Sequence, residues 1–96
     1  MQPSLITTTI NYVIQDTDYT VLGDASGGSI DITLPPNNTN YRGRIYVVKK
    51  IDATSNDIMF LPDGTDKIDG QDFVAINTRN ESVTVQADGT GNWRIL

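Results

Sequence analysis

The sequence predicts an all-β domain, folded as a small antiparallel β-sandwich or a barrel-like variant of one. Val, Ile and Thr supply 30 of the 96 residues, against four Ala and one Glu. Branched side chains suit a pleated sheet, and strong helix formers are scarce. Alternating apolar and polar segments recur about every 8 to 12 residues, a spacing typical of sandwiches and barrels. A chain of this length holds one core, so we expect a single domain.

The first predicted strand covers residues 6–15, where one parity is apolar and the other polar. Residues 1–10 are an N-terminal arm or the start of this strand, and residues 11–96 form the body of the domain. A strand edge with small Thr side chains is suited to adding itself to a sheet of another protein. The alternative is an ordinary strand that pairs within its own subunit. The candidate docking residues are Leu5, Ile6, Thr8 and Ile10.

The next predicted strands cover residues 19–22 and 29–34, with a turn rich in Gly and Asp between them. Pro35 and Pro36 remove two backbone hydrogen-bond donors and end the second of these strands. The last predicted strands cover residues 44–51, 58–61, 72–77, 81–87 and 91–96.

Residues 44–51 and 58–61 are apolar on both faces, which indicates strands that are buried on both sides. One small sandwich covers a single face of such a strand, so we expect a neighbouring subunit to cover the other. In the strand over residues 44–51, one parity is assigned to the subunit core; it comprises Ile45, Val47 and Ile51. The other parity, which charged residues flank, is assigned to the contact between subunits; it comprises Arg44, Tyr46, Val48 and Lys50.

The residue types present exclude most enzyme classes. The sequence has neither His nor Cys, which removes the commonest general base, the thiol nucleophile and the usual zinc ligands. A carboxylate pair remains, because a glycan hydrolase uses two acids about 5 to 10 Å apart in a cleft. Nearly all of the 11 Asp lie in turn contexts, however, where Asp bonds its own backbone. We therefore expect no catalytic residues.

The densest acidic stretch is residues 63–72, which contain four Asp. Oxygen ligands of this kind suit a hard cation such as calcium. The carboxylates fall at every third residue, however, and no Glu closes the loop as it does in an EF-hand. Successive tight turns account for the pattern, so we expect neither a metal nor another cofactor.

The charge of the chain bears on its partners. A net charge of −5 at pH 7 repels phosphate backbones and anionic lipid, so nucleic acid is not an expected partner. No apolar run is long enough to span a bilayer, and the first residues lack the pattern of a signal peptide, so we expect no membrane insertion. The absence of Cys fits synthesis in a reducing cytoplasm.

Two features are candidates for ligand binding. Four of the seven basic residues cluster at Arg42, Arg44, Lys49 and Lys50, but strand alternation splits them between faces, which favours a charged rim. Trp93 is the only Trp, and its large apolar area favours a core or interface anchor over a platform for a sugar ring.

Eight short motifs follow one another over residues 12–96. They are Tyr19-Thr20-Val21-Leu22, Asp24-Ala25-Ser26-Gly27-Gly28, Ile32-Thr33-Leu34-Pro35, Gly43-Arg44-Ile45-Tyr46, Lys49-Lys50-Ile51-Asp52-Ala53, Ile68-Asp69-Gly70, Glu81-Ser82-Val83-Thr84-Val85-Gln86 and Asp88-Gly89-Thr90-Gly91-Asn92-Trp93. In this order they resemble a β module that recurs in bacteriophage virion appendages, in tail-fibre and head-fibre proteins.

The resemblance implies a structural protein of the virion surface that is made in the host cytoplasm, assembles as a trimer and docks on capsid or tail proteins. The family module usually sits on a longer chain, whereas about ten residues precede it here, which favours a small capsid-decorating or tail-tip protein. Two alternatives stay open. One is a receptor-binding module whose loops, such as residues 37–42, hold host-surface glycans, and the other is a carboxylate-dependent glycan hydrolase.

Overall fold

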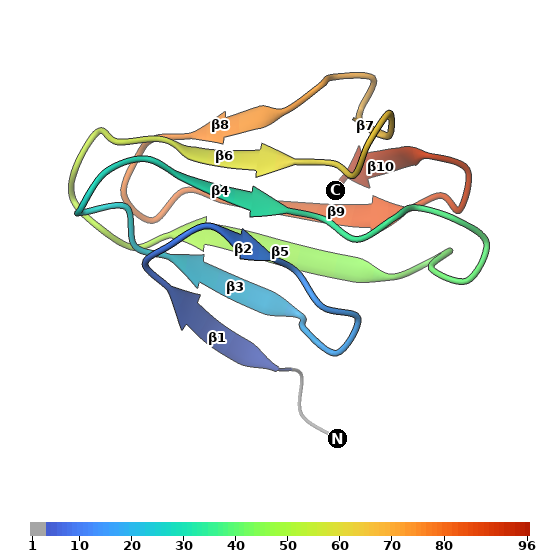
Figure 1. The fold of residues 1–96 in the computed structure, drawn as a ribbon, viewed down its shortest axis with the longest axis horizontal. Coiled ribbons are helices and arrows are strands. Elements are labelled where there is room, and N and C mark those ends of the chain that lie inside the picture. The colour runs from blue at the N-terminus through green and yellow to red at the C-terminus, as the bar shows by residue number, and fades with distance from the viewer. Residues whose placement is uncertain (1–3) are drawn as a thin grey trace.

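The computed structural model describes residues 4–96, which form ten strands in two layers and no helix (Figure 1). The all-β prediction is confirmed. The strands are β1 (Leu5–Thr8), β2 (Tyr12–Val13), β3 (Thr20–Gly23), β4 (Ile30–Thr33), β5 (Ile45–Lys50), β6 (Ile58–Leu61), β7 (Lys67–Ile68), β8 (Val74–Ile76), β9 (Ser82–Ala87) and β10 (Asn92–Ile95).

Both sheets are mixed, so the expected antiparallel sandwich is wrong in strand direction. The larger sheet has the order β1-β3-β5-β9-β10-β7 and the smaller sheet the order β2-β4-β6-β8. Strand β3 runs parallel to both β1 and β5, and β4 runs parallel to both β2 and β6. Antiparallel pairing is confined to β9 with its two neighbours and to β6 with β8.

The parallel pairs arise because the chain winds as a flattened coil. Strands β1 to β6 alternate between the two sheets, so each turn of the coil lays one strand on each layer. In Figure 1 the arrows of β1, β3 and β5 point one way, and those of β2, β4 and β6 point the other way. We call β1 to β6 the parallel roll. Strands β8 and β9 pair antiparallel with its last turn.

The core lies between the two layers. Each layer contributes the inward parity of its strands, and the fully buried side chains include Trp93, Tyr46, Phe60, Ile32, Ile58 and Val48. Gly23 of β3 lies where the layers approach closely, since a Cβ there would come within 2.4 Å of the Ile58 methyl group. A larger residue would force the layers apart.

The structure reverses the predicted faces of β5. Tyr46, Val48 and Lys50 are fully buried within the chain, whereas Ile45 and Val47 lie half-buried on the outer face. The inward parity faces the smaller sheet, because β5 lies in the middle of the larger one between β3 and β9. Tyr46, Val48 and Lys50 are therefore core residues and cannot form the subunit contact. Ile51, expected in the core, lies half-buried just beyond the strand, and Arg44 remains exposed.

The predicted strand over residues 6–15 is two strands in different sheets. Strand β1 pairs with β3 in its own chain, as the second of the two N-terminal alternatives expected. Thr8 ends β1, because its hydroxyl donates to the Ile10 carbonyl and accepts the Ile10 N–H. The chain then crosses to β2, and Ile10 is 71% exposed.

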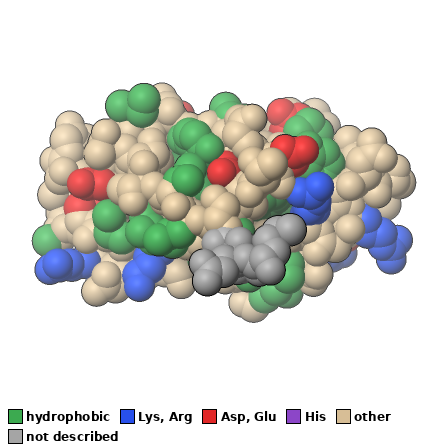
Figure 2. Space-filling model, turned by 90° about the horizontal axis from the view of Figure 1, so that it is seen from below, with side chains coloured by type: hydrophobic (Ala, Val, Ile, Leu, Met, Phe, Trp, Pro, Cys, Tyr) green, Lys and Arg blue, Asp and Glu red, His purple; other side chains and the backbone are tan. Residues whose placement is uncertain are grey.

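Strands β1 and β2 lie together at one end of the roll, the end that Figure 2 shows from outside. Of the four candidate docking residues, Leu5 and Ile10 are exposed, Ile6 is half-buried and Thr8 is buried. Met1, which the docking arm also included, lies outside the described residues, as do residues 2–3.

Candidate functional site

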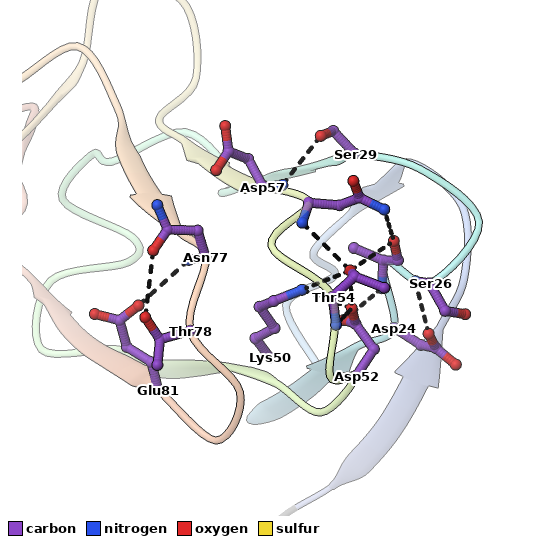
Figure 3. Close-up of polar contacts among 12 residues, drawn as sticks. Asp24, Ser26, Ser29, Lys50, Asp52, Thr54, Asp57, Asn77, Thr78 and Glu81 are labelled. Atoms are coloured by element: carbon purple, nitrogen blue, oxygen red, sulfur yellow. Dashed lines mark hydrogen bonds and ion pairs between the residues drawn. The ribbon is translucent and has the colours of Figure 1, made fainter.

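A buried ion pair lies at the C-terminal ends of β3 and β5, where the chain turns toward the other layer (Figure 3). Lys50 is the last inward residue of β5, and its Nζ lies 2.7 Å from Oδ2 of Asp52. Both side chains are almost completely buried. Burial alone would raise the pKa of Asp52, but the Lys50 ammonium and the other donors around it hold that pKa well below its usual range.

The same carboxylate ties two turns together. Oδ1 of Asp52 accepts the Ala25 N–H at 2.8 Å, and Oδ2 accepts both the N–H and the hydroxyl of Thr54. Asn56 adds a second link, because its Nδ2 donates to the Ala25 carbonyl at 2.8 Å. The oxygens of Asp52 are thus already occupied, so this cluster positions the turns and offers no free acid or base for a substrate.

The acidic stretch over residues 63–72 does not form a cage. Asp66 accepts the Asn37 N–H at 2.9 Å, Asp69 accepts the Ile95 N–H at 3.3 Å, and Asp72 pairs with Lys67. Each of these carboxylates serves a different segment. Within residues 4–96, no group of three or more His, Cys, Asp or Glu side chains is placed to hold a metal ion.

A hollow of about 300 Å³ opens at the other end of β5, beside the residues that precede this strand. Six residues line it: Arg42, Gly43, Gln86, Ala87, Asp88 and Arg94. We call it the arginine hollow. The stem of Arg42 packs on Gly89, where a Cβ would lie 2.9 Å from the Cβ of Arg42. Gln86 is fixed by donating its Nε2 hydrogen to the Gly43 carbonyl at 3.1 Å.

The charges of the arginine hollow are only partly compensated. Burial would raise the pKa of Asp88, but the backbone N–H groups of Thr90 and Asn92 donate to its Oδ1 and outweigh burial, so the pKa is lowered. Its other oxygen lies 3.9 Å from Nη2 of Arg94. The Arg42 and Arg94 side chains are both exposed. Guanidinium groups bind carboxylates through paired hydrogen bonds, so the hollow suits an acidic ligand.

The predicted basic cluster is therefore dispersed by the fold. Lys50 is buried in its ion pair, whereas Arg44 donates to the Asp16 carbonyl and lies 5.5 Å above the Tyr41 ring. Arg42 instead lines the same hollow as Arg94 of β10, a residue that no local spacing connects to it. Trp93 is fully buried with its ring 5.7 Å from that of Tyr46, as expected of a core anchor.

The outer face of the larger sheet is partly apolar. Leu22 of β3 and Ile45 and Val47 of β5 point away from the smaller sheet and are half-buried. These three residues, which we call the outer apolar face, lie on two neighbouring strands. Charged side chains such as Lys49 border the face on the same strands.

Several of the motifs that resemble the virion module have clear roles in this fold. Ala25 and Asp52, from two different motifs, meet in the buried cluster. Asp69 has a positive φ of 48° and Gly70 one of 77°, so that motif makes a tight turn.

No protein-family model matches the chain, and no curated protein sequence is significantly similar to it. In the part of the chain that the structure describes, no helix is long and apolar enough to cross a membrane.

Proposed function

We propose that the protein is a non-enzymatic structural component of the bacteriophage virion surface. It is a small module of the capsid-decorating, head-fibre or tail-fibre type, which assembles as a trimer and docks on capsid or tail proteins after synthesis in the host cytoplasm. The eight motifs support this proposal through their resemblance to virion appendage modules. The use of Asp52 and Lys50 to brace turns fits a structural rather than a catalytic role.

The observation that carries self-assembly is the outer apolar face. Ile45 and Val47 share the outer parity of β5, and Leu22 lies opposite Lys49 and diagonal to Val47 on a sheet whose other side is already covered by the smaller sheet. Grouped apolar side chains on an exposed sheet favour contact with another chain. The subunit contact of the trimer therefore uses this outer parity of β5, with Lys49 at its rim.

The mass of the assembly tests the proposal. Sedimentation of the wild type at micromolar concentration should give the mass of three chains, and Val47→Lys should give one chain that still unfolds cooperatively, at a lower melting temperature because the trimer contact is lost. Thr33→Lys is the matched control, because Thr33 is also half-buried and points outward, but from the smaller sheet. A wild type that sediments as one chain contradicts the trimer.

A second experiment tests the location. Mass spectrometry of purified virions should detect the chain, and antibodies against it should label intact particles. Absence of the chain from purified particles contradicts a virion role, whatever its oligomeric state.

The arginine hollow favours a second candidate function, the binding of an acidic host glycan. Its two guanidinium groups fit the carboxylate of a uronic or sialic acid, and the fixed amide of Gln86 and the carboxylate of Asp88 fit sugar hydroxyls. Because Trp93 is buried, stacking on that ring takes no part.

NMR titration with an acidic and with a neutral monosaccharide tests this candidate. Shifts around residues 86–88 should appear with the acidic sugar alone and vanish in Arg42→Ala. Arg79→Ala is the matched control, since Arg79 is exposed in the β8–β9 connection. Equal shifts with both sugars, or shifts that survive Arg42→Ala, contradict the candidate.

A further inference from the structure

Within residues 4–96, one edge of strand β1 has no partner strand, and the backbone groups of β1 have a defined direction. The Ser4 carbonyl accepts the Thr20 N–H at 3.0 Å, and the Thr8 carbonyl accepts the Asp24 N–H at 2.9 Å. Backbone groups of successive strand residues point to opposite sides, so Ser4, Ile6 and Thr8 face β3. The N–H and C=O groups of Leu5 and Thr7 therefore point away from β3, toward solvent.

The β1 edge also lacks the features that usually protect a sheet edge. Native edge strands carry charges, Pro or bulges that block the addition of another strand. Residues 4–15 contain no charged residue and no Pro, although 20% of the chain is charged. The edge strands at the other side of the sheets are better protected. Strand β7 has two residues and a Lys67–Asp72 ion pair, and β8 has three residues.

We propose that the β1 edges of two copies of this chain pair antiparallel about a two-fold axis, which joins their larger sheets into one. The edge matches itself, because residues 4–15 are uncharged in both copies and present the same two outward residues. Pairing of β1 with β7 or β8 of another copy is disfavoured, because those strands are shorter and β7 carries charges. A self-complementary patch of this kind gives a closed dimer.

The backbone directions fix the register of the contact. The register that pairs both outward residues of β1 within the strand places Leu5 of one copy opposite Thr7 of the other, whereas Leu5 opposite Leu5, or Thr7 opposite Thr7, pairs only one of the two within β1. Each such pair exchanges two hydrogen bonds in an antiparallel ladder, and the two-fold axis supplies the second pair. Ile6 then lies opposite Ile6 of the second copy as a pair that makes no hydrogen bonds, with their Cα atoms about 4.5 Å apart.

The dimensions of the molecule set an upper limit on the area of the contact between the two end faces. The molecule measures 36 × 32 × 20 Å, and the end that carries β1 and β2 spans the longest and shortest of these axes. The rectangle that encloses this face measures about 700 Å², which is an upper limit for the contact and compares with the ~800 Å² that each partner buries in a standard interface.

Apolar side chains are available on the same face. Leu5, Ile10 and Val13 are 65%, 71% and 56% exposed, and a hollow of about 350 Å³ lies beside Ile10 and Gly28. Figure 2 shows several separate hydrophobic clusters there, with acidic and basic side chains between and beside them. The acidic groups belong to neighbouring segments, because the first charged residue of the chain is Asp16.

The two-fold contact does not depend on the three-fold assembly, because it uses the β1 edge rather than the outer apolar face. Sedimentation equilibrium between about 1 µM and 1 mM tests it with Thr7→Lys, which places a charge on the edge. If the smaller species is one chain, the wild type at high concentration should have twice the mass of Thr7→Lys. If it is a trimer, each particle presents three β1 edges, and the wild type should have at least twice the mass of Thr7→Lys. Thr90→Lys, in the exposed β9–β10 turn, should behave as the wild type.

Two further variants keep the test decisive. Thr7→Pro removes an outward N–H but no hydrogen bond to β3, so it should fold and also fail to double in mass. Ile6→Cys should form a disulfide-linked dimer on oxidation, because the chain contains no other Cys and the expected Cα separation suits a disulfide. Equal masses for wild type and Thr7→Lys across the range, or a failure of Ile6→Cys to crosslink, overturn the proposal.

Discussion

Lys50 and Asp52 form an ion pair at 2.7 Å, with 0% and 4% of their side-chain surfaces exposed. Removing one partner of such a pair leaves the other charge buried without compensation. We expect Lys50→Met to lower the free energy of unfolding in urea by about 3 to 5 kcal/mol. Lys49→Met, which changes the adjacent half-exposed residue, should stay within about 0.5 kcal/mol of the wild type. Similar losses of unfolding free energy in both variants would contradict a specific contribution of the buried ion pair.

The lowered pKa of Asp52 links stability to pH. Because the pKa is lower in the folded protein than the ~3.9 of an unfolded chain, the carboxylate stabilises the fold fully above that value. This stabilisation is lost as pH falls below about 4, by at most ~1.4 kcal/mol per pH unit. The difference in unfolding free energy between wild type and Asp52→Asn should therefore shrink between pH 7 and pH 3. A constant difference would mean that Asp52 does not carry the acid sensitivity.

Gly89 should resist substitution. Its φ is +82°, and a Cβ would lie 2.9 Å from the Cβ of Arg42, so Gly89→Ala should cost about 1 to 3 kcal/mol. Gly27 provides the control, because a Cβ at that position would have no neighbouring atom within 4 Å and its φ is not in the positive range. Gly27→Ala should leave the melting temperature unchanged or raise it slightly. Equal melting temperatures for the two variants would contradict this packing of Arg42.

Tyr12 should titrate unusually late. Partial burial, together with the hydrogen bond that its hydroxyl donates to Asp18 at 2.6 Å and the charge of that carboxylate, raises its pKa to about 12. One of the four Tyr should therefore ionise near pH 12 in a spectrophotometric titration, and Asp18→Asn should bring that step closer to 10. Because the folded pKa is the higher one, this hydrogen bond stabilises the fold below about pH 10 and is lost as pH rises toward 12.

The sequence predicts strand positions and buried parity better than strand partners. Ile30 and Ile32 are buried in β4, which lies within the predicted strand over residues 29–34, and β6 matches the predicted strand over residues 58–61. Alternation reports which side chains are buried, but it does not say which strand lies alongside. Parallel neighbours such as Leu5 and Thr20, or Ile30 and Ile58, are far apart in the chain, so no local pattern marks their pairing.

The errors at the candidate sites have a common physical cause. Lys50 suggested an exposed rim because charged residues are usually solvated. The residue that could have predicted the burial of Lys50 is Asp52. A carboxylate two residues away neutralises the Lys50 ammonium, so both side chains can be buried. No local sequence pattern marks the arginine hollow, because Arg42 and Arg94 line the same hollow only after β9 and β10 are in place.

The winding of β1 to β6 between layers sets how fast the chain can fold. Each parallel pair closes a loop of at least 15 residues, as Leu5 and Thr20 show, so none can form as a quick local hairpin. The shortest closure between paired strands is that of β9 with β10, where Ala87 lies beside Trp93. This hairpin should acquire protection from hydrogen exchange first during refolding, and the parallel turns should follow over milliseconds to seconds, as in other proteins dominated by non-local contacts.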